Sequence, residues 1–384
     1  MVSLKQFSRR RPARHESEHH LFSSEGTHFE RIRLVSEGPL GEAILLARRH
    51  PPQGRAELVV VKALDRRQPR KARERLAEEA RLASRLSHPG IVRVFGHYQQ
   101  GETGYTVSEF VEGTSLATAL CDAALLARPL SEELGLYVCA EVAGALHYAH
   151  TLADERGQPL GLVHRDVCPA NLRVSREGRV KLSGFGVAWS RLPGREETTE
   201  EAAPLGDADY AAPERLCAGG ARLQHEARAD LFSLGLVLLE LVTGQHLYYV
   251  EPLDRRVAHV HTVKKRGTWG EWEGEPLGLE ELALRADCYG PGDVEYALHG
   301  LSEPVKVVLR KLLRREPAER HATGAELEAE LRRCLRARSW WYGPWRAARE
   351  LARLRAEAVP LWRGAEAVGT FRSVDAFENV DRDE

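Results

Sequence analysis

The spacing of apolar residues changes once along this chain, near Gly113, and that change constrains the fold more than any other feature. Before it, apolar residues occur in short runs of strand length, such as 58–61. After it, they recur every three or four positions, as on one face of a helix. A chain that places its strands before most of its helices is typical of the α+β class, with a sheet and a mainly helical region as separate parts.

Five strands and one helix are expected before this change. The strand-like runs cover 31–35, 43–47, 58–61, 91–98 and 105–111, and the helix covers 69–86. Residues 1–28 are polar and lack periodicity, which predicts a disordered arm. Its histidines, His15, His19 and His20, are typical of either a metal-binding tract or a solvated tail, and we favour the tail.

Capping and apolar patterns place helices in the second part. Ser131 is expected to cap a helix that runs to His150. The run 229–243 is almost entirely apolar, which predicts a buried helix. Thr323 and Glu326 have the spacing of a capping box, which predicts a last helix ending near 335.

Charge and cysteine content argue against several classes of function. The formal net charge is −1, so no overall field attracts nucleic acid or a membrane, and we expect neither as a partner. The most apolar run, 231–242, is too short to span a bilayer, and the arginine-rich start lacks the apolar segment of a secretory signal. The six cysteines form no CxxC pair, so we expect free thiols and a cytoplasmic protein.

Several short motifs follow one another in a specific order. Lys62 ends an apolar strand, and Glu79 lies on the helix that follows it. His-Arg-Asp at 164–166 is followed five positions later by Asn171. Further along come Tyr-Ala-Ala-Pro-Glu at 210–214, Asp230 at the start of the apolar helix, and Arg320 after Pro317. In this order the motifs resemble those of the serine/threonine protein kinase family, from about 29 to 335.

The resemblance implies the two-lobed kinase fold, which is α+β. A small N-lobe with a five-stranded sheet and one helix is expected over 29–112, and a large, mainly helical C-lobe over 113–337. Residues 338–384 are expected to form a tail with an aromatic cluster and then a basic helix at 347–356.

The resemblance also implies roles for individual residues. Lys62, held by Glu79, is implied to contact the α and β phosphates of ATP. Asp166 is implied to accept or orient the substrate hydroxyl, and Asn171 to bind a metal ion. Asp230 is implied to support the catalytic-loop backbone, and Arg320 to pair with Glu214.

Further positions are implied to surround the nucleotide. They are Ser36, Gly38 and Gly41 in the phosphate loop, Ala43 and Val60 as the adenine roof, Ser108, Glu109 and Val111 along the adenine edge, and Arg173 as the floor. Arg173 replaces an apolar residue of the family. Its guanidinium either stacks on a purine or turns to solvent or into the cleft, and we favour the latter.

Three positions depart from the family in ways that affect catalysis. Gly184 stands where the family has the aspartate of Asp-Phe-Gly, and Mg²⁺ needs such carboxylate oxygens. Cys168 stands where a lysine meets the γ-phosphate, although a redox-sensitive thiol is an alternative role. Asp207 replaces a threonine and is expected to face Asp166 with a like charge. With Asn171 as the one remaining metal ligand, we expect weak ATP binding and doubtful Mg²⁺ binding.

These observations favour a pseudokinase, a kinase-like signalling domain that binds another protein as a regulatory or scaffolding module. The alternative is an active serine/threonine kinase that transfers the γ-phosphate with little or no need of magnesium. A small-molecule phosphotransferase is a third possibility, which Glu214 and Arg320 disfavour because they match protein kinases.

Two segments leave alternatives open. Thr198 or Thr199 is a candidate for phosphorylation and pairing with Arg165, although the glutamates beside them could dock there instead, or the loop could be solvated. The tail carries an aromatic cluster, Trp340, Trp341, Tyr342 and Trp345. It is either an exposed docking site or packed against the C-lobe, and we favour packing.

Overall fold

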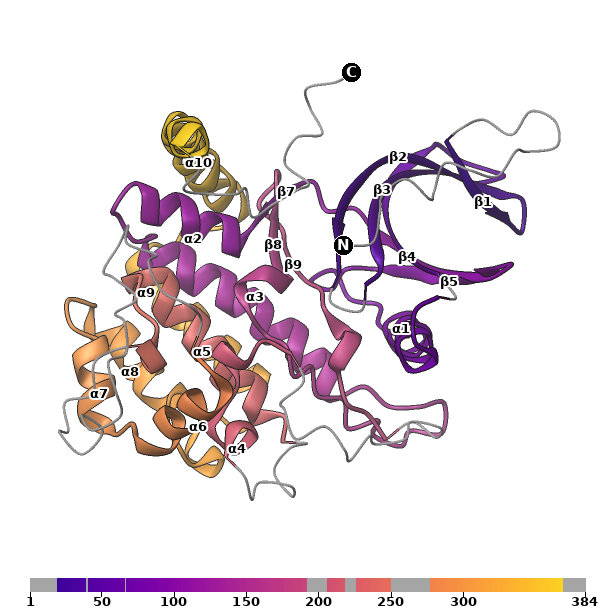
Figure 1. Ribbon diagram of the computed structural model, residues 1–384. Helices are drawn as coiled ribbons and strands as arrows, with labels where there is room; N and C mark the ends of the chain where they lie inside the picture. The colour runs from indigo at the N-terminus through magenta and orange to yellow at the C-terminus, as the bar shows by residue number, and fades with distance from the viewer. Residues whose placement is uncertain are drawn as a thin grey trace. The chain divides into compact units, whose positions relative to one another are not determined.

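The computed structural model describes residues 19–38, 41–65, 67–191, 206–217, 226–249 and 277–368. The chain forms two compact units, which we describe separately. The sheet unit comprises Met1–Arg81 and Val94–Phe110, and the helical unit comprises Leu82–Arg93 and Val111–Glu384. These two units, the first rich in strands and the second in helices, confirm the α+β class (Figure 1).

The sheet unit is built on an antiparallel sheet with the strand order β1-β2-β3-β4-β6-β5. Figure 1 shows this sheet as a curled layer in indigo and purple, with α1 beside it. In chain order its elements are β1 (His20–Ser24), β2 (Thr27–Glu37), β3 (Ala43–His50), β4 (Glu57–Asp65), α1 (Arg70–Ala83), β5 (Val94–Gln100) and β6 (Thr103–Glu109).

The first strand corrects two expectations, because residues 20–28 belong to the sheet and the sheet has six strands instead of five. Phe22 is fully buried, and its ring stacks on Phe29 and on Tyr105 at 4.4 Å between centroids. A five-residue strand with one buried aromatic residue has too little alternation to be recognised. No group of three or more potential metal ligands occurs in the described residues, and His15 lies outside them.

The helical unit contains one small sheet, β7-β8-β9, and a set of packed helices. Short 3-10 turns lie at Pro169–Asn171, Phe185–Val187, Ala208–Tyr210, Leu247–Tyr249 and Pro317–Glu319. The remaining elements are β7 (Gly113–Ser115), α2 (Leu116–Leu125), α3 (Glu132–His150), β8 (Leu172–Ser175), β9 (Val180–Leu182), α4 (Pro213–Leu216), α5 (Arg228–Thr243), α6 (Leu279–Cys288), α7 (Pro291–Ala297), α8 (Glu303–Leu312), α9 (Gly324–Arg338) and α10 (Pro344–Val368).

The expected helix caps are present. Ser131 Oγ accepts a hydrogen bond from Leu134 N at 3.1 Å, and Thr323 Oγ1 accepts one from Glu326 N at 3.2 Å. The apolar helix α5 is buried along almost its whole length, as expected. The expected strand at 91–98 begins only at Val94, because Ile91 bridges to Leu182 instead.

The tail is more extensively folded than expected, because α10 begins before and ends after the predicted 347–356. It packs against α2, beside which it lies in yellow in Figure 1. The preference for a packed aromatic cluster is confirmed for half-buried Tyr342 and wrong for the tryptophans. Trp340, Trp341 and Trp345 are 76%, 53% and 66% exposed.

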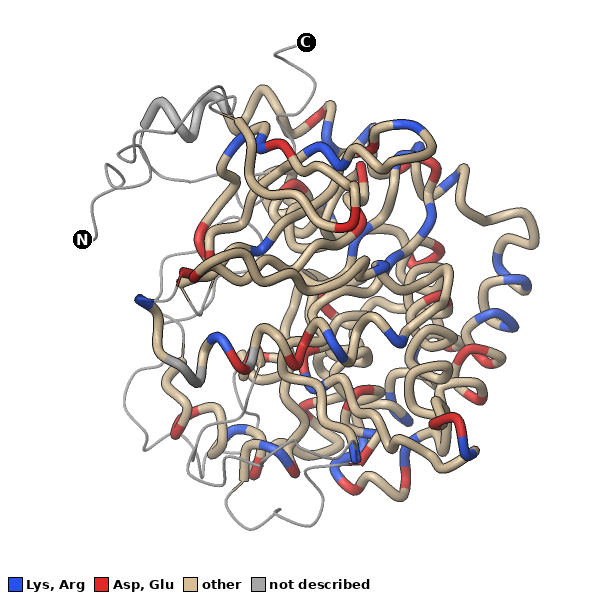
Figure 2. Tube along the Cα trace, turned by 90° about the vertical axis from the view of Figure 1, so that its right-hand side faces the viewer, with Lys and Arg blue, Asp and Glu red and all other residues tan. Residues whose placement is uncertain are grey.

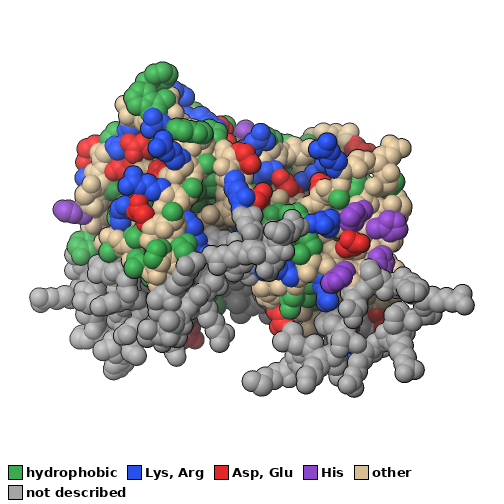
Figure 3. Space-filling model, turned by 90° about the horizontal axis from the view of Figure 1, so that it is seen from above, with side chains coloured by type: hydrophobic (Ala, Val, Ile, Leu, Met, Phe, Trp, Pro, Cys, Tyr) green, Lys and Arg blue, Asp and Glu red, His purple; other side chains and the backbone are tan. Residues whose placement is uncertain are grey.

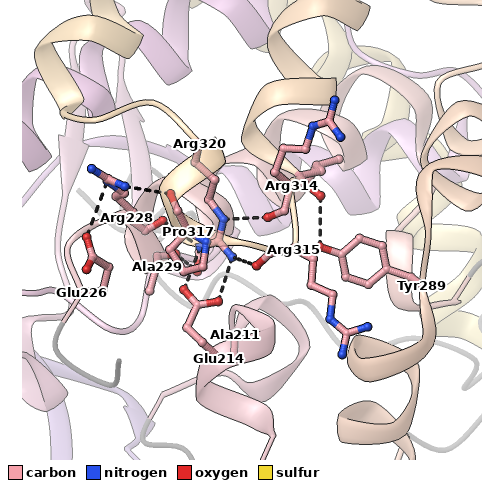
Figure 4. A network of polar contacts seen from close by, with 12 residues as sticks. Ala211, Glu214, Glu226, Arg228, Ala229, Tyr289, Arg314, Arg315, Pro317 and Arg320 are labelled. Atoms are coloured by element: carbon pink, nitrogen blue, oxygen red, sulfur yellow. Dashed lines mark hydrogen bonds and ion pairs between the residues drawn. The ribbon is translucent and has the colours of Figure 1, made fainter. Parts of the chain in front are cut away.

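A buried ion pair joins two motifs of the helical unit. Arg320 Nη1 and Nη2 donate to the two carboxylate oxygens of Glu214 at 2.7 and 2.8 Å, and both side chains are almost fully buried. Figure 4 shows the same guanidinium also reaching the backbone oxygens of Arg314 and Arg315. This bidentate pair was expected from the resemblance, and it ties α4 to the loop before α9.

Surface charge and hydropathy agree with the balanced composition. Figure 2 shows basic and acidic residues interspersed along the chain, including on α1 in front. Within the described parts of the chain, no helix is long and apolar enough to cross a membrane.

Candidate functional site

The sheet unit contains the expected ion pair. Lys62 near the end of β4 and Glu79 on α1 lie 2.8 Å apart, Nζ to Oε1. The two side chains are 29% and 13% exposed, so solvent screens the pair only in part. A lysine held in this way is fixed in position as a phosphate ligand requires.

The loop between β2 and β3 brings in a residue that the sequence analysis missed. Gly38 N donates to Glu42 O at 2.8 Å, and Gly41 has a φ of +77°, which favours glycine. The Glu42 carboxylate is buried directly against Gly38, where an added Cβ would lie 2.7 Å from Oε2. The Glu42 side chain therefore fills space within the loop that covers phosphates in the family. Ser36 lies one residue before the end of β2, opposite Ile44.

The two residues implied as the adenine roof are not brought together. Ala43 lies opposite Ala63 and packs against the buried core, whereas Val60 lies opposite Leu46 and Ser108. Because side chains alternate along a strand, Ala43 and Val60 point to opposite faces. Ile44 lies opposite Lys62 and shares the face of Val60. Period-two alternation therefore identifies Ile44, in place of Ala43, as the roof residue on that face.

The remaining residues of the implied adenine edge lie in two separate parts. Ser108 and Glu109 end β6 in the sheet unit, whereas Val111 is buried in the helical unit. Arg173 on β8 donates from Nη2 to Gly113 O at 2.8 Å. The guanidinium is therefore tied to the backbone of β7.

Asp230 holds the catalytic loop in the helical unit. Its carboxylate accepts hydrogen bonds from His164 N at 2.7 Å, Arg165 N at 2.8 Å and His150 Nε2 at 2.8 Å. Burial alone would raise the pKa of Asp230, but these donors and the neighbouring histidines lower it below its usual value. Arg165 is held at a φ of +68°, which orients the backbone that carries Asp166.

Asn171 and Gly184 occupy the region that holds metal in catalytic kinases. Asn171 Nδ2 donates to Asp166 Oδ2 at 2.7 Å and to Asp166 O at 2.8 Å. Gly184 has a φ of +86°, and a Cβ built on it would lie 2.5 Å from both Asn171 Nδ2 and Oδ1. The amide of Asn171 therefore fills the space that a side chain at 184 needs.

Cys168 and Asp207 complete the surroundings of Asp166. The Cys168 thiol is buried, and burial together with the charge of Asp166 raises its pKa strongly, so an easily oxidised thiolate is disfavoured. The group of Asp207 that contacts Asp166 is its backbone N–H, which donates to Asp166 Oδ1 at 2.7 Å. The carboxylate accepts from Asp209 N instead, which corrects the expected contact of two like charges.

Arg215 is a second residue that the sequence analysis missed. Its Nη1 donates to Arg165 O at 2.5 Å. Burial lowers the pKa of this guanidinium, while Asp230 and Asp166 oppose that effect. Arg215 follows Glu214 in the sequence and lies 50 positions from Arg165, so only the fold brings it to the catalytic loop.

Taken together, these residues do not fit magnesium. A hard cation needs several oxygen ligands, but Gly184 has no side chain and Asn171 offers only the one neutral oxygen of its amide, whose nitrogen donates to Asp166. The candidate phosphosites Thr198 and Thr199 lie outside the described residues. The geometry defines a protein-kinase catalytic loop whose metal-binding half is altered.

Comparison with known proteins agrees with this class. Residues 29–330 match the family described as "Protein kinase domain", so the chain belongs to the protein kinase family. It is 30% identical over 262 residues to serine/threonine-protein kinase PknB of Mycobacterium tuberculosis, which covers 67% of this chain and 35% of that protein. It is 33% identical over 297 residues to tyrosine-protein kinase MasK of Myxococcus xanthus, covering 76% and 40%.

A third relative is serine/threonine-protein kinase PknJ of Mycobacterium tuberculosis, 35% identical over 217 residues, which cover 56% of this chain and 33% of that protein. The matched segments thus span 33% to 40% of the length of these relatives. The shared part is a serine/threonine-kinase-like domain.

Proposed function

We propose that this chain is a pseudokinase that acts as a regulatory or scaffolding module and binds another protein. One observation carries the proposal: Gly184 provides no carboxylate to hold a divalent ion, and the Asn171 side chain occupies the space where such a side chain would lie. In the family's mechanism the metal ions neutralise charge between the β and γ phosphates. Loss of that charge compensation removes about 3–5 kcal/mol of transition-state stabilisation.

Two further features support the proposal. The buried neutral thiol of Cys168 cannot replace the positive charge of a lysine at that position. The buried Glu42 side chain fills space against Gly38 in the loop that covers phosphates in the family. Both changes oppose the binding of a triphosphate.

The second candidate is an active kinase that depends weakly or not at all on magnesium. The Lys62–Glu79 ion pair, at 2.8 Å, is the observation that favours it, since this pair is assembled in active kinases. Because both the pseudokinase and the active kinase could bind ATP, ATP binding alone does not distinguish them.

Phosphate transfer to a generic basic protein tests the proposal. The chain is incubated with γ-labelled ATP and magnesium or manganese, beside an Asp166→Ala variant. We expect the same background incorporation for both proteins. Incorporation that depends on Asp166 establishes the active-kinase alternative.

The proposed location in the cytoplasm rests on the six cysteines, which form no disulfide in the described residues. Nucleic acid and membranes are not proposed as partners, because basic and acidic residues are interspersed (Figure 2).

A further inference from the structure

An aromatic patch projects from the helical unit where α10 begins. It consists of Trp340, Trp341 and Trp345, each more than half exposed. Figure 3 shows hydrophobic side chains gathered in a projection on the face seen from above. Among the described residues most large apolar side chains are buried, so three exposed indoles in six positions indicate an interaction surface.

The backbone under the patch is fixed, so the exposure is imposed by the fold. Tyr342 is turned inward, and its hydroxyl donates to Glu350 Oε2 at 2.6 Å. Glu350 in turn accepts hydrogen bonds from Ser131 N and Oγ at 3.1 and 2.8 Å. Pro344 packs so closely on Gly178 that a Cβ added to Gly178 would lie 2.7 Å from the Cα of Pro344.

Helix α10 anchors the other side of the patch. One stripe of the helix is buried, and it consists of Ala347, Leu351, Leu354, Ala358 and Trp362. Asp122 on α2 accepts hydrogen bonds from Arg355 Nη1 at 2.8 Å and Trp362 Nε1 at 2.6 Å. A partner would therefore meet a preorganised surface and lose little entropy in ordering it.

The charge of the patch is positive. The guanidinium carbons of Arg346 and Arg349 lie 5.4 Å from the ring centroids of Trp341 and Trp345. Within the described residues neither arginine forms an ion pair with a carboxylate, and the adjacent Glu350 is engaged with Ser131. Tryptophan and arginine are the residue types most enriched at the energetic centres of protein interfaces.

We propose that the aromatic patch, with Arg346 and Arg349, docks an acidic peptide segment of a partner protein that carries aromatic or aliphatic side chains between its carboxylates. Carboxylates complement the two guanidinium groups, and apolar side chains cover the indoles. A lipid surface is a poorer match, because anionic lipids select clusters of about four to eight basic residues. The proposal rests on the proposed regulatory function and adds the surface at which the partner binds. The docking itself needs neither nucleotide nor metal.

The test uses the full chain and a fluorescein-labelled synthetic peptide that repeats Glu-Glu-Phe. Fluorescence anisotropy is expected to show saturable binding that weakens as salt rises. A Trp340→Ala, Trp345→Ala variant and an Arg346→Glu, Arg349→Glu variant are each expected to bind at least about ten-fold more weakly. A peptide with lysine in place of glutamate is expected not to bind.

Matched controls lie elsewhere on the helical unit. Tyr296→Ala removes an aromatic residue that is 54% exposed on α7. Arg314→Glu reverses a charge just after α8. Lys311 near the end of α8 pairs with Glu326 near the start of α9. Arg314 therefore lies near the start of α9, whereas the patch follows the end of α9. Both controls are expected to bind the peptide like the unaltered chain.

Absence of saturable peptide binding overturns the proposal, as does equal binding by the patch variants and the controls. Sedimentation with phosphatidylserine vesicles is measured in parallel, and binding to vesicles without binding to the peptide overturns it in favour of a lipid surface. Thermal unfolding checks each variant. If the tryptophan variant is unfolded, the charge-reversal variant decides, since its residues are exposed. Failure here leaves the phosphate-transfer result unaffected, so the two proposals fail separately.

Discussion

Replacing Gly184 with alanine tests whether Asn171 occupies the space that a side chain at 184 needs. The backbone there has a φ of +86°, which costs a residue with a Cβ about 1–2 kcal/mol. The new Cβ also forces Asn171 away from Asp166, and a hydrogen bond to a charged group contributes about 1.5–3 kcal/mol. The two effects together predict a loss of about 2.5–5 kcal/mol in the free energy of unfolding.

Urea denaturation, followed by circular dichroism, measures this loss as a change of midpoint at constant slope. The same substitution is then made in an Asn171→Ala background, where no amide is left to displace. We expect Gly184→Ala to cost only the backbone contribution there, about 1–2 kcal/mol. An equal cost in both backgrounds refutes the packing of Asn171 against Gly184, as does a Gly184→Ala variant that is as stable as the unaltered chain.

Three other substitutions test the rest of the structure. Arg320→Ala leaves the buried Glu214 carboxylate unpaired and is expected to lower the free energy of unfolding by about 3–5 kcal/mol, whereas a cost below about 1 kcal/mol in urea denaturation contradicts the buried pair. Phe22→Ala is expected to cost about 3–5 kcal/mol through the cavity it leaves, and normal urea stability of this variant would mean that β1 is not part of the sheet. Asp230 has a pKa below its usual 3.8, so its stabilisation is complete above about pH 4 and is lost as pH falls through the lower folded-state value. Asp230→Asn is therefore expected to be less stable at neutral pH and to lose less stability on acidification, and parallel pH curves for the two proteins contradict that role.

Much of the helical unit could be predicted because its signals are local. The caps at Ser131 and Thr323 and the apolar run of α5 lie within a few residues of the structure they produce. The pairing of Glu214 with Arg320 spans 106 positions, and it was predicted only because the motif order resembles a known family.

The parts that could not be predicted depend on contacts between distant segments or on side-chain direction. The family resemblance implied that Asp207 lies near the catalytic aspartate, but not that its backbone amide faces Asp166 while the carboxylate caps a turn. Glu42 and Arg215 had no local signal, because burial against Gly38 and contact with Arg165 O exist only in the folded chain.

The exposure of the tryptophans likewise followed from no local pattern. An aromatic cluster after the last expected helix is compatible with burial or exposure, and the anchoring of Tyr342 by Glu350 decides between them. Strand β1 was missed because a single aromatic residue, Phe22, provides most of its burial and leaves no alternating pattern in the sequence.

The most direct test of the central claim is a thermal-shift titration of the chain with ATP, with and without magnesium. A magnesium ion that bridged nucleotide and protein would add stability in proportion to the tighter binding. Because no carboxylate stands at Gly184 and Asn171 offers only one neutral amide oxygen, we predict that magnesium leaves any ATP-induced shift of the melting temperature unchanged. A shift that requires magnesium would contradict the account.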